Sequence, residues 1–171
     1  MVYDRQYIQD YISRFVSPKR PELEDVLMDA FDALESGRHL SEHALAGIVD
    51  GASDRQAQIY ETCTEFLGEA AAEDPKALKK IEEMAVSTVA HVRHNALLCL
   101  NPRISSRFTA ERVRAGLEDK SARVRTKAAD WAQRLSLREV QPELLLASKV
   151  ESDQGTLKVM QAALRSLQGK R

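Results

Sequence analysis

The residues best suited to chemistry in this sequence are its histidines, its cysteines and its charged side chains. His39 and His43 are four residues apart, a spacing with which two histidines on one helix can hold a metal ion. Ser41 is the expected N-cap of that helix, so His39 precedes the helix and does not share a face with His43. His91 and His94 are three residues apart, but no Cys or carboxylate lies within one turn of both. Both pairs are expected to be surface histidines, and the sequence predicts no metal and no cofactor.

Cys63 and Cys99 fall at apolar positions of predicted helices, where a free thiol acts as a small core residue. They provide no disulfide or zinc framework, which favours a cytoplasmic location. The sequence contains no Ser/His/Asp set, no phosphate-binding glycine loop and no paired-cysteine motif. The sequence therefore predicts that the protein is not an enzyme.

Four polar side chains recur at positions i, i+4, i+7 and i+11 of one predicted helix: Arg123, Lys127, Asp130 and Arg134. They share the face opposite the apolar one. Arg123, Lys127 and Arg134 are accordingly candidate binding residues for an anionic partner. The equivalent positions in the preceding copy of an internal repeat add His91 and Asn95. The alternative interpretation, a helix face that contacts only water, stays open.

Charge is distributed unevenly along the chain, although the net charge is only −1. Residues 1–85 contain 9 basic and 18 acidic side chains, whereas residues 86–171 contain 16 basic and 8 acidic ones. Most of the positive excess lies in residues 86–138, with 11 basic against 4 acidic side chains. This split indicates a surface with a definite sign, which could attract an oppositely charged partner. The protein is expected to be a monomer or to self-associate weakly from head to tail.

Apolar residues at helical spacing, separated by turn residues, predict an all-α fold. Only 5% of the residues are aromatic, which fits helices packed through Ala, Leu and Val better than a β-sandwich. Gly37 and Asn101-Pro102 should end helices, whereas Ser41 and Asp74-Pro75 should begin them. Ten helices are expected, over about 3–16, 22–36, 41–49, from 53 or 54 through 67, 75–85, 88–100, 106–118, 121–135, 140–150 and 154–168. Short connectors between them predict antiparallel neighbours.

An internal repeat distinguishes a stack of helix pairs from a simple bundle. Val92-Arg93-His94-Asn95-Ala96-Leu97 recurs further along the chain as Val124-Arg125-Thr126-Lys127-Ala128-Ala129. The same interval leads once more to a degenerate copy in the same helical phase, at positions 156–161. Each repeat is a helix pair that cannot bury its apolar face alone, so stacking completes the core.

The segment Asp119-Lys120-Ser121-Ala122-Arg123-Val124-Arg125, followed by Ala128, resembles the turn and second helix of a HEAT repeat. The resemblance covers residues 75–168 well, but residues 1–72 only by continuity, with Asp50 a loose match. It implies a right-handed α-solenoid of about five antiparallel helix pairs, whose second helices line a concave face.

The same resemblance implies a polar ladder between repeats, formed by Asp119 with Arg125, or with Arg93 in the neighbouring repeat. Ser87 replaces the aspartate in the repeat of Arg93. Glu151 with Leu157 is expected to leave the pattern altogether. In this interpretation Arg93 and Arg125 are structural.

Trp131 is the only tryptophan and follows Asp130 directly. HEAT-like DNA glycosylases use Trp, Asp and Arg in a concave groove, but consecutive residues of a helix face different directions, so these roles are not transferred here. Trp131 is instead expected in the core, where its truncation would cost about 3–5 kcal/mol. The full set of expected core positions is Val92, Ala96, Leu100, Val124, Ala128, Trp131 and Leu135.

These observations predict one HEAT-like repeat domain over residues 1–171 that acts as a non-enzymatic protein-binding scaffold. The alternative is a nucleic-acid-binding protein that uses the basic region 86–138. No signal peptide is expected, because charges at Asp4, Arg5 and Asp10 interrupt the first apolar residues. No stretch reaches the roughly 18 apolar residues of a membrane span, so no membrane partner is expected.

Overall fold

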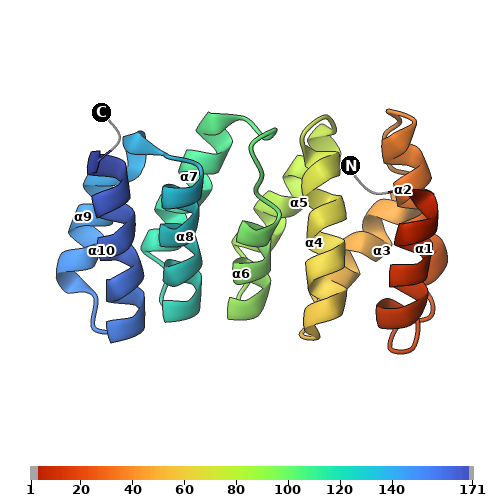
Figure 1. Ribbon diagram of the computed structural model, residues 1–171, viewed down its shortest axis with the longest axis horizontal. Helices are drawn as coiled ribbons and strands as arrows, with labels where there is room; N and C mark the ends of the chain where they lie inside the picture. Colours follow the sequence, from red (N-terminus) through yellow and green to blue (C-terminus); the bar gives the residue numbers. More distant parts are fainter. Residues whose placement is uncertain (1–3, 170–171) are drawn as a thin grey trace. The chain divides into compact units, whose positions relative to one another are not determined.

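The computed structural model describes residues 4–169, and over this range the protein consists of helices and turns without a β-strand (Figure 1). The described residues form ten α-helices: α1 Arg5–Tyr11, α2 Leu23–Glu35, α3 Glu42–Ala52, α4 Ala57–Ala71, α5 Pro75–Ala85, α6 Ala90–Leu98, α7 Ser106–Leu117, α8 Ala122–Arg134, α9 Gln141–Val150 and α10 Gln154–Gly169. A π-helical turn over Ile12–Val16 continues α1, and a 3₁₀ turn over Arg138–Val140 precedes α9. The predicted all-α class is confirmed.

The helix ends follow the capping residues of the sequence. The Ser41 side chain accepts a hydrogen bond from the backbone N–H of Ala44 and begins α3. Asp74 caps α5 in the same way, with Pro75 at the first helical position. Gly37 follows α2 with φ of +65°, a conformation that costs glycine little because it has no Cβ. These three boundaries were predicted and are confirmed.

Contacts within the chain form two compact units, residues 1–103 (unit 1) and residues 104–171 (unit 2). The boundary lies just after Asn101-Pro102, the dipeptide predicted to stop a helix. It also separates the charges: unit 1 contains 11 basic and 18 acidic residues, a net of −7. Unit 2 contains 14 basic and 8 acidic residues, a net of +6.

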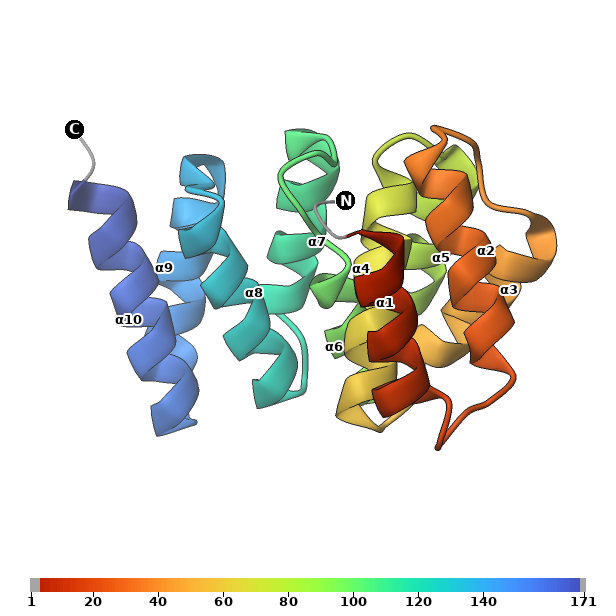
Figure 2. The ribbon, with the colours of Figure 1, turned by 45° about the vertical axis from the view of Figure 1, so that its right-hand side comes forward.

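Unit 1 is organised around α4, which contacts α2, α3, α5, α6 and the π-helical turn after α1. The inner face of α4 is fully buried through Ile59, Cys63, Phe66 and Leu67. Figures 1 and 2 both show α1 lying beside α4. A Cβ at Gly68 of α4 would overlap the carbonyl oxygen of Cys99, so glycine permits the close approach of the chain after α6.

Unit 2 is held together by α8, which packs against both α7 and α10. Ala128, Ala129 and Ala132 on α8 are fully buried, as are Met160 and Ala163 on α10. Small side chains on α8 allow close packing between the helices, which maximises dispersion contacts. The remaining helix, α9, contacts α7 and α10.

Four of the seven predicted core positions are buried: Ala96, Leu100, Val124 and Ala128. The other three, Val92, Trp131 and Leu135, are only half-buried, which corrects the prediction. Leu135 is the C-cap of α8 and Val92 lies in the first turn of α6, so both have fewer neighbours than a mid-helix residue.

Trp131 has a different reason for its partial exposure. The equivalent positions in the repeats before and after it are Cys99 and Ala163, which are fully buried small residues. Tryptophan is much larger than Cys or Ala and is rarely buried completely, which fits its partial exposure. Among the described residues, the Trp131 Nε1 has no hydrogen-bond partner.

No helix of residues 4–169 combines the length and the apolar character that crossing a bilayer would require.

Candidate functional site

The predicted basic row lies on α8, on the side away from its buried alanines. Arg123 is exposed, and the Arg134 side chain is 65% exposed. Lys127 is more enclosed, with 25% of its side chain exposed. These three candidate residues therefore share one helix face, as their spacing predicted.

Asp130 neutralises part of this row. Its Oδ2 lies 3.3 Å from the Lys127 Nζ, and its Oδ1 accepts a 2.9 Å hydrogen bond from the Arg134 Nε. One carboxylate therefore pairs with two of the three cations. The face is a mixed surface with an excess of positive charge, because Asp130 offsets one of its three cations.

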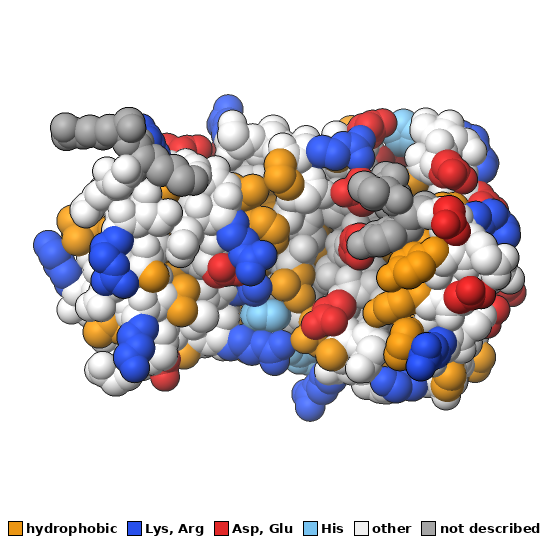
Figure 3. Space-filling view, in the orientation of Figure 1, with side chains coloured by type: hydrophobic (Ala, Val, Ile, Leu, Met, Phe, Trp, Pro, Cys, Tyr) orange, Lys and Arg blue, Asp and Glu red, His pale blue; other side chains and the backbone are white. Residues whose placement is uncertain are grey.

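Further cations lie on the neighbouring helix of the same unit. Lys158 and Arg165 are exposed on α10, which packs directly against α8. Figure 3 shows Lys and Arg side chains over both helices on the face in view. We call Arg123, Lys127, Arg134, Lys158 and Arg165 the basic face of unit 2. The two α10 residues were not identified from the sequence, because α10 is a degenerate copy of the repeat.

Arg125 lies on the same helix but has a structural role. Its Nε and Nη2 donate to the two carboxylate oxygens of Glu151 at 2.6 and 2.7 Å, and its Nη1 donates to the Asp119 carbonyl at 2.8 Å. The Glu151 side chain is only 1% exposed. The hydrogen bonds from Arg125 hold the pKa of Glu151 below its usual range. Arg125 thus links the turn before α8 to the turn before α10.

This contact corrects the expectation that Glu151 leaves the repeat pattern. Glu151 occupies the position of Asp119 one repeat later, and it accepts Arg125 even though Leu157 supplies no arginine of its own. The longer glutamate side chain keeps the aspartate's function in the turn. Arg93 makes the corresponding local contact in unit 1, where its Nη1 donates to the Ser87 carbonyl at 2.8 Å.

The turns before the even-numbered helices α4 to α10 share a hydrogen bond. In each turn a side-chain oxygen accepts the backbone N–H two residues later: Asp54 from Gln56, Ser87 from Val89, Asp119 from Ser121 and Glu151 from Asp153. The four acceptors follow one another at a nearly constant interval along the chain. The repeat position in the first half is therefore Asp54, and not Asp50 as the sequence suggested. The signal was present in Asp54-Arg55-Gln56-Ala57, which parallels Asp119-Lys120-Ser121-Ala122.

Contrary to the prediction, Asn95 is not part of an accessible binding face. It is 0% exposed, and its Nδ2 donates to the carbonyls of Ala52 and Asp54 at 2.9 and 3.3 Å. The last carbonyls of a helix lack partners within the helix, so a buried amide that reaches them removes a desolvation cost. The Asn95 side chain is therefore a tether between α6 and the end of α3.

His91 has a similar position. Its Nε2 lies 3.0 Å from the Ser53 carbonyl oxygen, and the residue is half-buried. Arg20 contacts the same segment, with Nη1 2.9 Å from Asp54 Oδ2 and Nη2 2.5 Å from Asp50 Oδ2. Sequence reasoning missed Arg20, because nothing local connects it to two aspartates that are far away along the chain.

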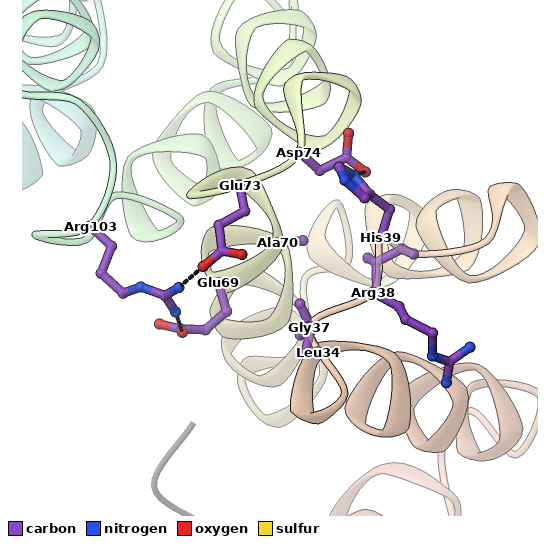
Figure 4. A pocket seen from close by; sticks show the side chains of 10 residues that line it. Leu34, Gly37, Arg38, His39, Glu69, Ala70, Glu73, Asp74 and Arg103 are labelled. Atoms are coloured by element: carbon purple, nitrogen blue, oxygen red, sulfur yellow. Dashed lines mark hydrogen bonds and ion pairs between the residues drawn. The ribbon is translucent and has the colours of Figure 1, made fainter.

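Of the remaining histidines, His43 is exposed, whereas His94 is buried, which corrects the expectation that it lies on the surface. His39 Nδ1 lies 3.2 Å from Asp74 Oδ2, at a small hollow in unit 1 that Arg103, Glu69 and Glu73 also line (Figure 4). His94 Nδ1 lies 3.1 Å from Asn95 Oδ1. In the described part of the chain no three His, Cys, Asp or Glu side chains gather as metal ligands would.

The two cysteines are buried and free. Burial raises the pKa of the Cys63 thiol to about 12 and also raises the pKa of Cys99. A thiol with such a pKa is protonated at neutral pH and is a poor nucleophile. Both cysteines therefore act as small core residues.

No protein-family model matches this sequence, and a search of curated proteins finds no match.

Proposed function

We propose that this chain is a non-enzymatic binding module built as a HEAT-like, right-handed α-solenoid, with the basic face of unit 2 as its docking surface. Its partner is a protein that presents an acidic segment. The two buried, reduced cysteines fit a cytoplasmic location, which belongs to the same proposal.

The repeated turns support the solenoid. Four turns at nearly constant spacing contain the same side-chain-to-backbone hydrogen bond, and Arg125 bridges two successive turns. A repeat protein is stabilised by such neighbour contacts, so the exposed side chains of its helices can vary without loss of the core. The basic face is a surface of this kind.

The observation that carries the function is the division of cations on α8. Arg125 pairs with the buried Glu151, whereas Arg123 and Arg134 are exposed on the other side of α8. Lys158 and Arg165 of the adjacent α10 are exposed as well. Charges that stabilise the turn and charges that face solvent are therefore separate residues. A surface of several cations steers and orients an anionic partner.

Nucleic-acid binding is the alternative, and Asp130 argues against it. Its carboxylate lies within the basic face and pairs with Lys127 and Arg134, where a phosphate would have to replace it. A protein partner can instead complement a mixed surface, with a donor opposite Asp130 and carboxylates opposite the arginines.

The test is a triple charge reversal, Arg123→Glu, Lys127→Glu and Arg134→Glu. Its matched control is Arg107→Glu, Arg138→Glu and Lys149→Glu, which makes the same charge change in unit 2 at exposed positions off the basic face. The probes are a labelled oligoglutamate peptide, a single-stranded oligonucleotide and a DNA duplex. We expect the wild-type protein and the control to retain the peptide, and the triple reversal to lose it.

Nucleic-acid binding would give a different result. The wild-type protein would retain the duplex or single strand near physiological salt, and affinity would fall with salt with a logarithmic slope of roughly 0.7–0.9 per phosphate contact. That outcome, or equal loss of the peptide by the control variant, would refute the proposed protein-binding function.

A further inference from the structure

A row of four glutamates follows α4 on its outer side, at intervals of one helical turn: Glu61, Glu65, Glu69 and Glu73. The last of them lies two residues beyond the helix. Side chains four residues apart on a helix are neighbours, so successive carboxylates can act as pairs.

The second pair of this row binds an arginine of the same unit. Arg103 Nη1 donates to Glu69 Oε2 at 2.7 Å, and Arg103 Nη2 donates to Glu73 Oε1 (Figure 4). Each terminal nitrogen of the guanidinium thus takes one carboxylate, and the two carboxylates are one turn apart. The molecule itself shows how this row accommodates an arginine.

The first pair, Glu61 and Glu65, has the same spacing but a different environment. Neither Glu61 nor Glu65 forms an ion pair with a side chain of residues 4–169. Beside them a groove of about 250 Å³ opens between α4 and α1, and Tyr7 and Tyr11 line its other wall. Figure 3 shows the hydrophobic side chains over α1 next to acidic side chains over α4.

The walls of this groove suit a flat cation. Tyr7 is 52% exposed, and the face of a tyrosine ring attracts a guanidinium that lies over it. Glu65 is exposed, but partial burial of its carboxyl group, and then the negative charge of Glu69, raise its pKa. A bound cation would relieve both effects, because it compensates the charge that the groove desolvates.

We propose that the groove between α1 and α4 binds an arginine side chain from a basic segment of a partner protein, with Glu61 and Glu65 as the carboxylate pair and Tyr7 and Tyr11 as the aromatic wall. Arginine fits better than lysine because its planar fork presents two terminal nitrogens to two carboxylates, as Arg103 does one turn further along. The net charge of −7 on unit 1 favours the approach of a basic segment. This site is in unit 1 and does not rest on the basic face of unit 2.

The experiment measures the fluorescence anisotropy of a labelled heptapeptide of alternating Gly and Arg, and of its lysine counterpart, with the full chain. The test variant is Glu61→Gln with Glu65→Gln, which removes two charges and keeps size and helix propensity. The control is Asp25→Asn with Asp29→Asn, an exposed pair on α2 with the same spacing and the same charge change. A second test variant, Tyr7→Ala, removes part of the aromatic wall at an exposed position.

We expect the arginine peptide to bind more tightly than the lysine peptide. The double glutamine variant should bind it about tenfold more weakly, since one exposed ion pair changes an affinity by up to about fivefold. Tyr7→Ala should weaken it by about two- to fivefold. The control should match the wild-type protein.

Three results would overturn the proposal. Equal binding by the wild-type protein and the double glutamine variant would show that Glu61 and Glu65 do not bind the peptide. An equal loss of affinity in the Asp25/Asp29 control would show that the peptide responds to the overall charge of the protein and not to this groove. If the glutamine changes instead abolished a salt-sensitive dimer of the chain and left peptide binding unchanged, the occupant would be a second copy.

Discussion

Asn95 and Lys127 occupy equivalent positions in successive copies of the repeat, yet they have different tasks. Lys127 keeps part of its side chain in solvent and pairs with Asp130, whereas Asn95 is fully buried. The amide of Asn95 donates to two carbonyls at the end of α3. A lysine side chain is longer and would bring a positive charge into this buried position. The chemistry of one residue thus decides whether its position belongs to the core or to the surface.

Replacing Asn95 by alanine should destabilise unit 1 by about 1–3 kcal/mol, because one buried and one part-buried carbonyl lose their donor. The measurement is the urea midpoint followed by circular dichroism. Glu82→Ala, at an exposed position of α5, is the control and should change stability by at most about 0.5 kcal/mol. Similar midpoints for the two variants would show that the hydrogen bonds of Asn95 do not contribute to the stability of unit 1.

Glu151 gives unit 2 a stability that depends on pH. Its pKa is lowered in the folded chain by Arg125, so the contribution is complete above the ordinary glutamate pKa of about 4.3 and is lost as the pH falls through the lowered value. Glu151→Gln should therefore be less stable than the wild-type protein at neutral pH, by about 1–3 kcal/mol, since the Arg125 side chain keeps 18% of its exposure. The difference should shrink on acidification. A difference that stays constant from neutral to acidic pH, measured in urea titrations, would contradict the role of the ion pair.

At the scale of helices, the packing of α4 against the end of α6 depends on one missing side chain. A methyl group at Gly68 would collide with the backbone carbonyl of Cys99, which cannot rotate away as a side chain can. We expect Gly68→Ala to cost about 1–3 kcal/mol, although alanine favours helix, because overpacking exceeds the gain in propensity.

Gly155→Ala is the matched control for this prediction. Gly155 lies in the first turn of α10, is exposed, and its added Cβ would come no closer than 3.3 Å to the Asp153 side chain. Thermal unfolding should separate the two variants clearly. If both change the midpoint equally, the contact between α4 and the chain after α6 is looser than the structure indicates.

For the whole molecule, the dominant feature is the charge split between −7 in unit 1 and +6 in unit 2. Unit 1 of one copy can attract unit 2 of another, which would produce an open-ended contact. We expect static light scattering to detect weak association at low ionic strength, and a monomer mass at about 0.5 M salt, where the Debye length falls to a few ångströms. A monomer mass at both salt concentrations, up to about a millimolar protein, would show that the charge split does not cause self-association.

The sequence by itself determined the helices and several of their ends, whereas α3 ends at Ala52 and α4 begins at Ala57, each about three residues later than expected. The apolar spacing predicted ten α-helices, and Ser41, Asp74-Pro75 and Gly37 marked boundaries where the structure has them. These features are local: an N-cap acts within three residues, and an amphipathic face repeats within a single helix. The position of Arg123, Lys127 and Arg134 on one face followed from spacing for the same reason.

Only the tertiary structure decided which polar side chains are available to a partner. Asn95 and Arg123 both looked exposed on a helical wheel, but the end of α3 lies against Asn95 and buries it. The contacts of Glu151 with Arg125 and of Arg20 with Asp54 join residues 26 and 34 positions apart. The groove between Tyr7 and Glu65 likewise exists only because α1 lies beside α4. Helical periodicity specifies the face of a residue, whereas burial and pairing depend on which distant segment covers that face.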